Sequence, residues 1–436
     1  MAAPREKIVY KRLTQKDAQL IAAKHEVLFA GRMGGARAVF AFCDLTGVDF
    51  SRRNLCDADF TGAVLAETNF AGAKLDSTSF FATDLRRASF ENASMRRCDL
   101  RGACLRGANL SGADLFECDM REGTIAERDR RGDLKFLRHD VGPAEMPAAL
   151  LANANLERAK LSGVVAVQAD FTDAIMRHAR LVRANLRGAQ MAGVNLESAD
   201  LSGADLSECN LDGAVLTNAR IQMATFDGAK MEGVLGDKPA GRLPQELDQP
   251  LDEMLARHHD WVESEGRKGK PCALADTDLR SAKNVHGLSL TALAAPRAIL
   301  YGLNLEGVKL QGAQLPGADL RMAKLNGADL RGVNLRGAKL SNADMRDCNL
   351  GPLLIADDKL MPAQLTGASL RYTDLRGADM RHAMLDEADL SYANLMGAVL
   401  RGTDFTNGLL SGAKIAHSAF REAIFDGAAG VTLLGC

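Results

Sequence analysis

The feature that most constrains the fold is a five-residue repeat of large apolar residues that runs through most of the chain. From Phe40 to Ile125 every fifth residue is large and apolar, and the same period runs from Leu151 to Met231, interrupted by the small Ala166. It returns from Leu300 to Phe425. Two positions before most of these large residues sits a small one, usually alanine. A period of five fits neither an amphipathic helix nor a simple alternating strand.

Each five-residue unit is interpreted as a short extended segment followed by a turn. Side chains alternate along an extended chain, so the large central residue and the small one two before it face the same side. The residue between them, often Asp or Asn, faces outward. The two residues after the centre must turn the chain, and the second is commonly glycine, as at Gly62 and Gly203, because glycine reaches the positive-φ conformations of tight turns. Repetition predicts a coil whose sides are each one unit long.

The phenylalanines indicate how many units close one coil. Two series with a spacing of 20 residues are Phe40, Phe60, Phe80 and Phe50, Phe70, Phe90. With four units per coil they become two stacks on opposite walls, and leucines on the other walls fill the interior without voids. A period of ten alone would also fit a two-unit coil.

These units resemble the repeats of the pentapeptide-repeat family, whose motif is A-[DN]-L-x-x. Matching units are ADFTG (58–62), ANLSG (108–112), ADLSG (199–203) and ADLRG (328–332). The resemblance implies an all-β solenoid, the right-handed quadrilateral β-helix of that family, with four units per coil. Because each coil buries its inward side chains only against neighbouring coils, the ends of such a stack need covering. The motif is specific for the fold and nearly silent on function.

The interruptions of the repeat predict two β-helical bodies, each started by a short capping helix. The expected parts are an N-terminal segment and capping helix (1–35), a first β-helix (36–234), a linker and capping helix (235–272), a second β-helix (273–430) and a tail (431–436).

Helical spacing of apolar residues runs from Thr14 to Phe29, whereas residues 1–12 fit a disordered tail better. The segment LDEMLARHHDWVESEG (251–266) also predicts a helix. The stretch 22–35 parallels 255–269, since each ends in glycine and leads into repeats. The parallel indicates that one plan, a helix followed by a β-helix, is used twice.

Three stretches depart from the regular repeat. Residues 126–148 interrupt the first β-helix, and we expect a loop that leaves one corner. Residues 351–362 keep the period but put Asp358 at an inward position, which indicates a distorted coil or a small bulge. The entry to the second β-helix, between Leu279 and Val285, needs one extra residue.

Motifs for catalysis or cofactor binding are weak. GRKGKPC (266–272) lacks the spacing of a phosphate loop, and there is no GxSxG. His258, His259 and Cys272 are candidate metal ligands, but adjacent histidines diverge on a helix, whereas a tetrahedral site needs converging ligands. We therefore expect no catalytic residue, no cofactor and no metal.

The cysteines and the absence of apolar runs favour a cytoplasmic protein. The nine cysteines are an odd number without a CxxC pair, which is typical of a reducing compartment. Cys98 and Cys118 occupy small inward positions 20 residues apart; we interpret them as apolar filler, with a redox pair as the alternative. The N-terminal residues lack the apolar core of a secretory signal, and no run is long enough to span a membrane.

Ladders of outward side chains are the candidate partner-binding residues. Arg381, Arg401 and Arg421 are 20 residues apart, as are Tyr372 and Tyr392, so each set should stack along the second β-helix. Tyr and Arg are enriched at binding hot spots. The alternative is a solvated face whose arginines are neutralised by nearby carboxylates, namely Asp379, Asp389 and Asp404.

The function that we favour is a non-catalytic scaffold, a rigid rod that presents these ladders to a protein partner. Lys+Arg 54 against Asp+Glu 56 gives a net charge of -2, which disfavours direct binding of nucleic acid. The resemblance supplies a second hypothesis, protection of DNA gyrase, a type II topoisomerase, by imitation of duplex DNA. That role needs an excess of negative charge, which this chain lacks. An enzyme is the third and least favoured hypothesis.

The open C-terminal coil is a possible site of dimerisation. The apolar residues near this end are Phe405, Phe420 and Phe425. Residues 431–434, the chain's own tail, could cover it, or a second copy of the chain could do so, and of the two we prefer the homodimer.

Overall fold

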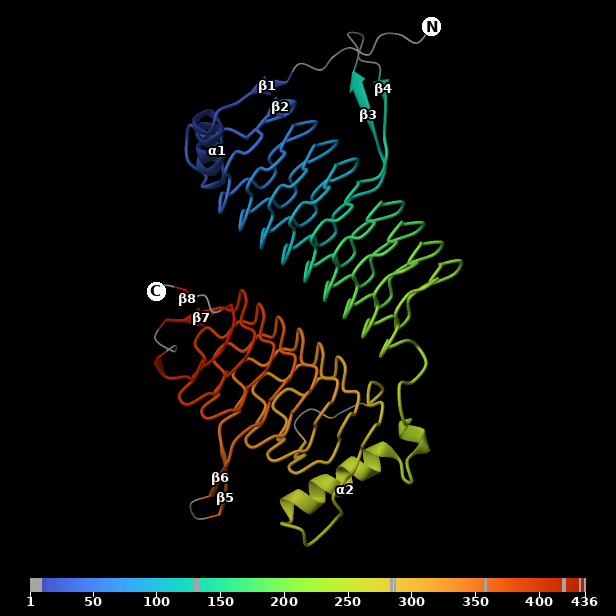
Figure 1. Ribbon diagram of the computed structural model, residues 1–436, viewed down its shortest axis with the longest axis vertical. Helices are drawn as coiled ribbons and strands as arrows, with labels where there is room; N and C mark the ends of the chain where they lie inside the picture. The colour runs from blue at the N-terminus through green and yellow to red at the C-terminus, as the bar shows by residue number, and fades with distance from the viewer. Residues whose placement is uncertain are drawn as a thin grey trace. The chain divides into compact units, whose positions relative to one another are not determined.

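The chain forms two compact units, Met1–Lys238 and Pro239–Cys436, and each is described by itself. The computed structural model describes residues 10–128, 134–282, 285, 288–356, 359–417, 421–430 and 433–434. Each unit contains a stack of nearly square coils with a helix beside its first coil (Figure 1). Residues 1–9 and Phe420 lie outside the described residues.

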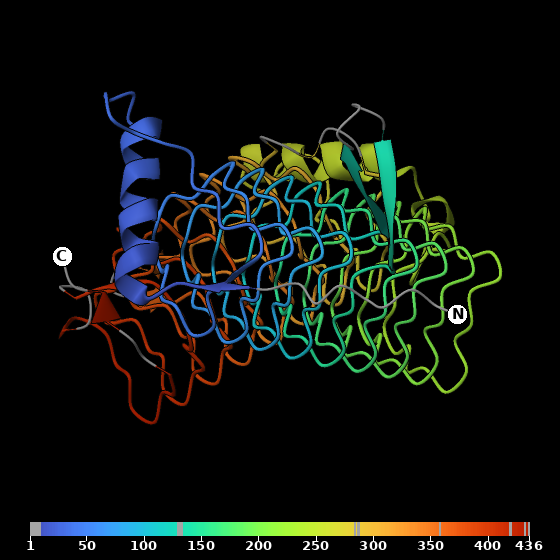
Figure 2. The same cartoon turned by 90° about the horizontal axis from the view of Figure 1, so that it is seen from above.

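Parallel main-chain bridges join residues that are 20 positions apart, so each coil consists of four five-residue units. In the first β-helix Asp59 bridges Ser79, which in turn bridges Asp99. In the second β-helix Asp319 bridges Lys339. The prediction of four units per coil is confirmed, and the two-unit coil is excluded. Figure 2 shows the coils of the first unit from the side, stacked along one direction.

The local bonds of a unit explain its sequence. At Phe60 the carbonyl accepts the N–H of Ala63 at 2.9 Å and closes a tight turn in which Gly62 has φ 62°. The carboxylate of Asp59 accepts the N–H of Thr61 at 2.9 Å, which gives the Asp or Asn before the centre a structural role as a turn cap. Glycine is not obligatory at the turn, since Arg52 also adopts positive φ there.

The core of the first unit is organised by its phenylalanines. Phe40 and Phe60 stack with ring centroids 4.8 Å apart, and Phe50 and Phe70 stack at 5.3 Å. Rings of the two stacks meet edge-on, as in the 5.9 Å contact of Phe50 with Phe60. The two predicted aromatic stacks are therefore present. In the second unit leucines fill the corresponding interior.

The first interruption is a hairpin rather than an irregular loop. Strands β3 (Gly123–Arg128) and β4 (Leu134–Val141) pair antiparallel, so Ile125 belongs to a strand of the hairpin and is not the centre of a unit. The repeat resumes at Met146, earlier than predicted, because Ala144 and Met146 are buried as the small and central residues of a unit. The coils stack continuously past the hairpin, as Cys104 bridges Glu145.

The second interruption is also a hairpin, rather than the distorted coil or small bulge that the sequence indicates. Strands β5 (Leu353–Ala356) and β6 (Lys359–Met361) pair antiparallel, and the stack bypasses them because Asn334 bridges Gln364. Ile355 and Leu360, which the period assigns to the core, are 48% and 56% exposed. Asp358 lies outside the described residues.

Helix α1 (Gln15–Phe29) packs on the first coil of the first unit. Thr14 begins the helix with a capping box to Asp17, and Ala18 and Ala22 on one face are fully buried. Gln15 exchanges two hydrogen bonds of 2.8 Å with the main chain of Asp49. The short strand β1 (Lys11–Arg12) pairs in parallel with β2 (Cys43–Asp44), so these residues are ordered against the coil and not part of a disordered tail.

Helix α2 (Leu251–Glu263) has the same relation to the second unit. The single-turn 3-10 helix η1 (Pro244–Glu246) precedes it, and Leu251 and Leu255 are buried against the first coil. The first coil carries the extra residue that the sequence predicts, since Ala273 bridges Ala294, 21 positions on.

At the C-terminal end, strands β7 (Ile415–Ala416) and β8 (Leu433–Leu434) form a parallel pair. The tail therefore adds a strand to the last coil, and Phe405 and Phe425 stack nearby with centroids 5.1 Å apart. Of the two covers expected for this coil, its own tail is the one that contacts it within the chain.

Candidate protein-interaction surface

Tyr372 and Tyr392 form a stacked pair, as their spacing predicts. Their ring centroids are 4.8 Å apart with planes inclined by 9°. Both occupy the second turn position of a unit at positive φ, and the ring of Tyr392 lies over Gly412, where an added Cβ would come within 2.5 Å of a ring carbon. The rings therefore lie along the rod and are only half-exposed, which leaves less contact area than projecting tyrosines would offer.

The arginines lie on a different corner from the tyrosines. Arg381 is the first turn residue after Met380, whereas Tyr372 belongs to the turn after Leu370, two units earlier in a four-unit coil. The two corners are diagonally opposite. The structure thus brings Tyr372 and Tyr392 together and separates them from Arg381, Arg401 and Arg421.

Arg381 is neutralised within its own unit. Its guanidinium donates two bonds to Asp379, with Nη2 2.6 Å from Oδ2, and this contact holds the pKa of the Asp379 carboxyl below its usual range. The guanidinium of Arg371 instead donates a hydrogen bond to the carboxylate of Asp389 at 3.0 Å. The carboxylate of Asp404 accepts a hydrogen bond from the hydroxyl of Thr406.

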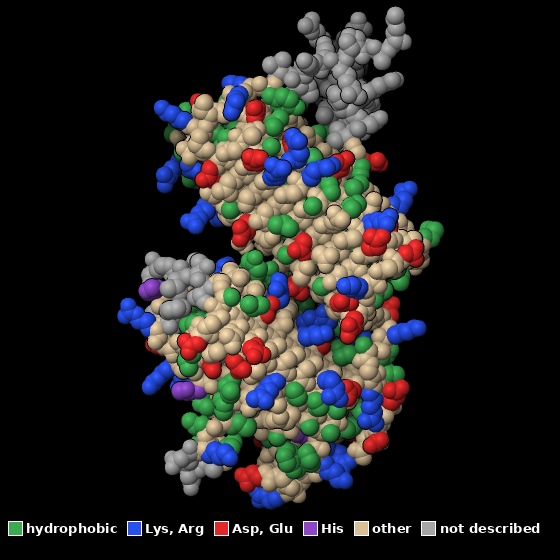
Figure 3. Space-filling model, viewed as in Figure 1, with side chains coloured by type: hydrophobic (Ala, Val, Ile, Leu, Met, Phe, Trp, Pro, Cys, Tyr) green, Lys and Arg blue, Asp and Glu red, His purple; other side chains and the backbone are tan. Residues whose placement is uncertain are grey.

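The same Asp-x-Arg pairing recurs in both β-helices. The described pairs of this kind are Asp84–Arg86, Asp99–Arg101, Asp119–Arg121, Asp278–Arg280, Asp319–Arg321, Asp329–Arg331, Asp344–Arg346, Asp374–Arg376 and Asp379–Arg381. In each pair one carboxylate receives a bidentate guanidinium across a single residue. Figure 3 accordingly shows charges of both signs interspersed over the visible face.

Arg401 departs from this pattern. The position that holds the pairing carboxylate in other units is Val399, which is 45% exposed. Arg401 and Arg421 are both exposed. Arg401 therefore has no carboxylate within its own unit, unlike Arg381 one coil earlier.

The corner that carries these arginines also carries the β5–β6 hairpin. We call it the hairpin corner; it follows the central residues Leu290, Leu310, Leu330, Leu350, Met380 and Leu400. The base of the hairpin lies on the preceding coils: an added Cβ at Gly332 would be 2.8 Å from Leu353 Cβ and from Met361 Cε.

The hairpin presents an apolar surface that the sequence reasoning missed. Leu354 is 61% exposed, and Ile355 and Leu360 are each about half exposed. The sequence contains a signal for this departure from the repeat. Ile355 and Leu360 stand at the five-residue interval, but the residues two positions before them, Leu353 and Asp358, are not small. Large apolar side chains grouped at an exposed site mark interaction surfaces.

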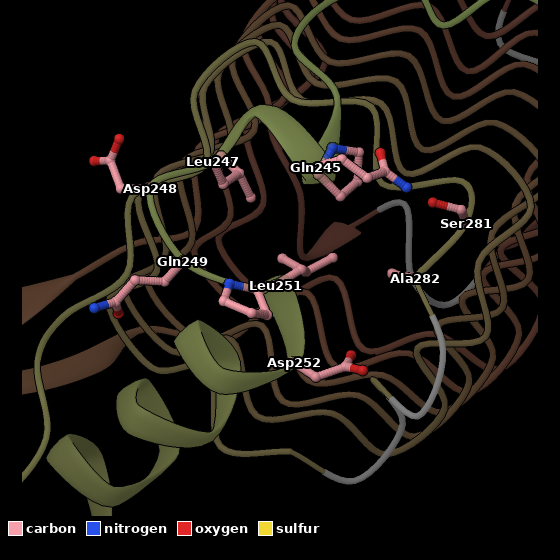
Figure 4. A pocket seen from close by; sticks show the side chains of 10 residues that line it. Gln245, Leu247, Asp248, Gln249, Leu251, Asp252, Ser281 and Ala282 are labelled. Atoms are coloured by element: carbon pink, nitrogen blue, oxygen red, sulfur yellow. The ribbon is translucent and has the colours of Figure 1, made fainter.

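A recess lies beside the start of α2. It has a volume of about 550 Å³ between η1, the start of α2 and the turn at Ser281 (Figure 4). Its ten described lining residues include Asp248 and Asp252 but no histidine, cysteine, lysine or arginine.

The proposed metal ligands have other roles. His258 accepts the N–H of Cys272 at 2.9 Å on one ring nitrogen, and its other nitrogen is 3.0 Å from the carbonyl of Thr291. Burial raises the pKa of the Cys272 thiol to about 11. Among the described residues, no three His, Cys, Asp or Glu side chains are grouped as metal ligands.

The inward cysteines Cys98 and Cys118 behave as buried polar fillers. Their thiols lie 3.0 Å from the carbonyl of Leu75 and 2.8 Å from that of Met95. Burial raises the pKa of the Cys98 thiol. Separately, none of the helices in the described part of the chain is long and apolar enough to cross a membrane.

The fold defines a parallel β-helical solenoid with four five-residue sides per coil. The family profile described as pentapeptide repeats matches in eight copies, at residues 43–80, 82–121, 149–188, 195–233, 298–337, 313–351, 363–402 and 393–428. These matches span more than half of the chain, which therefore belongs to the pentapeptide-repeat family, whose fold is the right-handed β-helix.

Three solved structures illustrate the similarity. HetL, a pentapeptide repeat protein involved in heterocyst differentiation regulation from the cyanobacterium Nostoc sp. strain PCC 7120, is 23% identical over 78% of this chain and 92% of its own, with a TM-score of 0.24. Full-length QnrB1, a plasmid-mediated fluoroquinolone resistance protein, is 20% identical over 46% and 92%, with a TM-score of 0.20. Rfr23 from the cyanobacterium Cyanothece 51142 is 25% identical over 33% and 91%, with a TM-score of 0.17. A comparison with curated protein sequences found no match.

Proposed function

We propose that this protein is a non-catalytic scaffold that binds a protein partner through the hairpin corner of its second β-helix. The observation that carries the proposal is the exposure of Leu354, Ile355 and Leu360 on a hairpin anchored to a rigid rod. Burial of a Leu or Ile side chain at an interface contributes roughly 1.5–3 kcal/mol. A rigid support adds to this, because little order has to be gained on binding.

A protein partner fits the charge of the rod better than a nucleic acid. Each Asp-x-Arg pair cancels its own charge, so the ladders of arginine do not sum to a positive stripe. The net charge of -2 likewise gives no acidic excess for imitation of DNA. Protection of a type II topoisomerase, the role suggested by the resemblance and by relatives such as a fluoroquinolone resistance protein, is therefore the less favoured alternative.

The tyrosine and arginine ladders enter this proposal as two separate contacts. Arg401 and Arg421 share the hairpin corner and are placed to bond carboxylates of a partner seated there. Tyr372 and Tyr392, on the opposite corner, would serve a different contact, and their role stays a prediction.

We further propose that the chain acts as two β-helical bodies, at 36–234 and 273–430, each covered at its start by a helix. The buried faces of α1 and α2 support this role. The tail strand β8 supports closure of the last coil within one chain, so the homodimer through this coil becomes the weaker proposal. The cytoplasmic location also stays a prediction.

The test is a quantitative affinity purification that compares wild type with the variant Leu354→Ser/Ile355→Ser/Leu360→Ser. The matched control is Leu150→Ser/Leu409→Ser, which removes two apolar side chains that are 45% and 47% exposed on the coil walls. We expect the hairpin variant to lose the partner and the control to retain it. Equal recovery by wild type and both variants would refute the hairpin corner, and the variant Tyr372→Ala/Tyr392→Ala then tests the opposite corner.

A further inference from the structure

Two buried histidines connect the two helices to their first coils through equivalent pairs of hydrogen bonds. In the first unit, Nδ1 of His25 accepts the N–H of Ala38 at 3.0 Å, and Nε2 donates to the carbonyl of Cys56 at 2.8 Å. Ala38 begins the first repeat unit, and Cys56 lies in the last turn of the first coil. His25 thus bridges the start and the end of that coil from the helix.

In the second unit, His258 makes the equivalent bonds. Its Nδ1 accepts the N–H of Cys272 at 2.9 Å, and its Nε2 donates to the carbonyl of Thr291 at 3.0 Å. Like His25, it is fully buried. The two histidines occupy the same position when segment 22–35 is aligned with 255–269, so the bridge is part of the duplicated plan.

These bonds require a neutral ring. A main-chain N–H can only donate, so Nδ1 must keep its lone pair, and the proton must sit on Nε2 to satisfy the carbonyl. A second proton on Nδ1 would point at the N–H of Ala38 or Cys272 and turn an attraction into a repulsion. It would also place a positive charge in a buried site, where desolvation disfavours the charged form.

We propose that protonation of His25 and His258 releases the two helices from their coils, so that acidification uncovers the N-terminal end of each β-helix. Release would expose the buried faces of the helices, including Ala18 and Ala22 in one unit and Leu251 and Leu255 in the other. It would also free the strand edges of the first coils. The two histidines would thus make the docking of each helix on its first coil sensitive to acid.

The surroundings of each ring favour the neutral form on balance. Burial is the largest influence and lowers the pKa of His25; Arg37 acts in the same direction, whereas Asp57 and Glu26 act against it. Glu26 is itself engaged with Arg53 at 2.9 Å.

Burial also lowers the pKa of His258, and the neighbouring His259 reinforces the effect. The carbonyls of Thr291 and Leu290 act against it. Since Nδ1 of His259 accepts the N–H of Ser289, a second ring on this helix faces the same coil.

The direction of the pH dependence follows from linkage. A histidine whose pKa is lower in the docked state binds more protons when released, so docking is strongest above the ordinary pKa of 6.5 and weakens as the pH falls below it. Each histidine changes the docking equilibrium by up to about tenfold per pH unit in that window. Each helix has its own buried histidine, so the pH should act on the docking of α1 through His25 and on the docking of α2 through His258.

Hydrogen exchange of the full-length protein at pH 7.5 and 5.5, corrected for the intrinsic exchange rates, tests the proposal. In wild type we expect protection of segments 15–38 and 251–272 to fall about tenfold at the lower pH, while coils between 60 and 115 stay unchanged. In His25→Asn and His258→Asn, protection of the corresponding segment should be reduced at both pH values and lose its pH dependence.

The matched controls are His178→Asn and His382→Asn. Both histidines are exposed turn residues at positive φ, which asparagine accepts, and these variants should behave as wild type. Equal wild-type protection at both pH values, or an unchanged pH dependence in the buried-site variants, would overturn the proposal. If those variants do not fold, NMR titration of wild type decides: two ring signals that titrate at or above 6.5 would contradict it.

Discussion

At the residue scale, the outward carboxylate of a five-residue unit bonds to groups of its own turn. Asp59 caps the N–H of Thr61, and Asp379 does the same for Arg381 while also receiving its guanidinium. An outward Asp before the centre is therefore a turn cap first and a surface charge second. This explains why arginine can recur at turn positions without a repulsive ladder.

The substitution Arg381→Gln tests this assignment. Because the Arg381 guanidinium holds the pKa of Asp379 below its usual value of 3.8, its removal should raise that pKa toward the ordinary range. The pair contributes stability above the ordinary carboxyl pKa and loses it as the pH falls. Since Arg381 is exposed and its charge is screened by solvent, we expect little change in stability at neutral pH. NMR titration of Asp379 is the measurement, and an unchanged pKa would show that the pair is not formed.

Substitution of a core phenylalanine should change the stability more than Arg381→Gln does. Phe60 contacts Phe40, Phe50, Phe70 and Phe80, so Phe60→Ala leaves a cavity and should destabilise the first unit by about 3–5 kcal/mol. Met223→Ala removes a side chain that is 85% exposed and serves as the control. Denaturant unfolding gives both values, and similar losses would contradict the stacked core.

At the scale of elements, the sequence predicts the coils better than the hairpins. The coils follow from period and residue size, both of which are local. The β5–β6 hairpin keeps apolar residues at the five-residue interval, at Ile355 and Leu360, but the small residue two positions earlier is absent. This hairpin packs closely over Gly312 and Gly332 of earlier coils, an approach that the period does not encode.

Two glycines of the second unit test the docking of the β5–β6 hairpin. Gly332 and Gly327 have φ of 65° and 66°, so alanine is equally strained at both. Only at Gly332 would the new Cβ meet Leu353 and Met361, whereas Gly327 faces open space. Gly332→Ala should therefore destabilise the protein more than Gly327→Ala, by about 1–3 kcal/mol. Equal losses in thermal unfolding would show that the hairpin is not packed on its corner.

The candidate site was predictable only in part, for a reason of geometry. The stacking of Tyr372 on Tyr392 follows from the 20-residue spacing. That the arginine and tyrosine ladders occupy opposite corners also follows, once four units per coil are known. The apolar surface of the hairpin does not, because the same residues fit an inward position equally well.

At the scale of the whole molecule, two β-helices each begin beside a helix that packs on the first coil. Limited proteolysis should cut first within 236–250 or within 126–141, since exposed main chain outside stacked coils is cut most readily. The second range is shorter than the interruption 126–148 because Ala144 and Met146 already belong to a coil. Cleavage in 236–250 should release two fragments that remain folded by circular dichroism. Early cuts inside 40–120 would contradict this organisation.

Removal of residues 431–436 tests how the last coil is closed. If β8 covers that coil, the truncated protein should lose hydrogen-exchange protection around Ile415, which pairs with Leu433, and should associate more strongly than wild type through the uncovered coil. Sedimentation analysis and hydrogen exchange measure the two effects. Unchanged protection around Ile415 would show that something other than the tail closes the coil.

The most direct test of the central claim, that the hairpin corner is the partner-binding surface, is site-specific photo-cross-linking in cells that produce the protein. A photoreactive residue is placed at Ile355 or Leu360 on the hairpin, or at Leu409 on a coil wall as the control. The account predicts one discrete protein adduct from both hairpin positions and none from the control. No adduct from the hairpin, or the same adduct from all three positions, would contradict it.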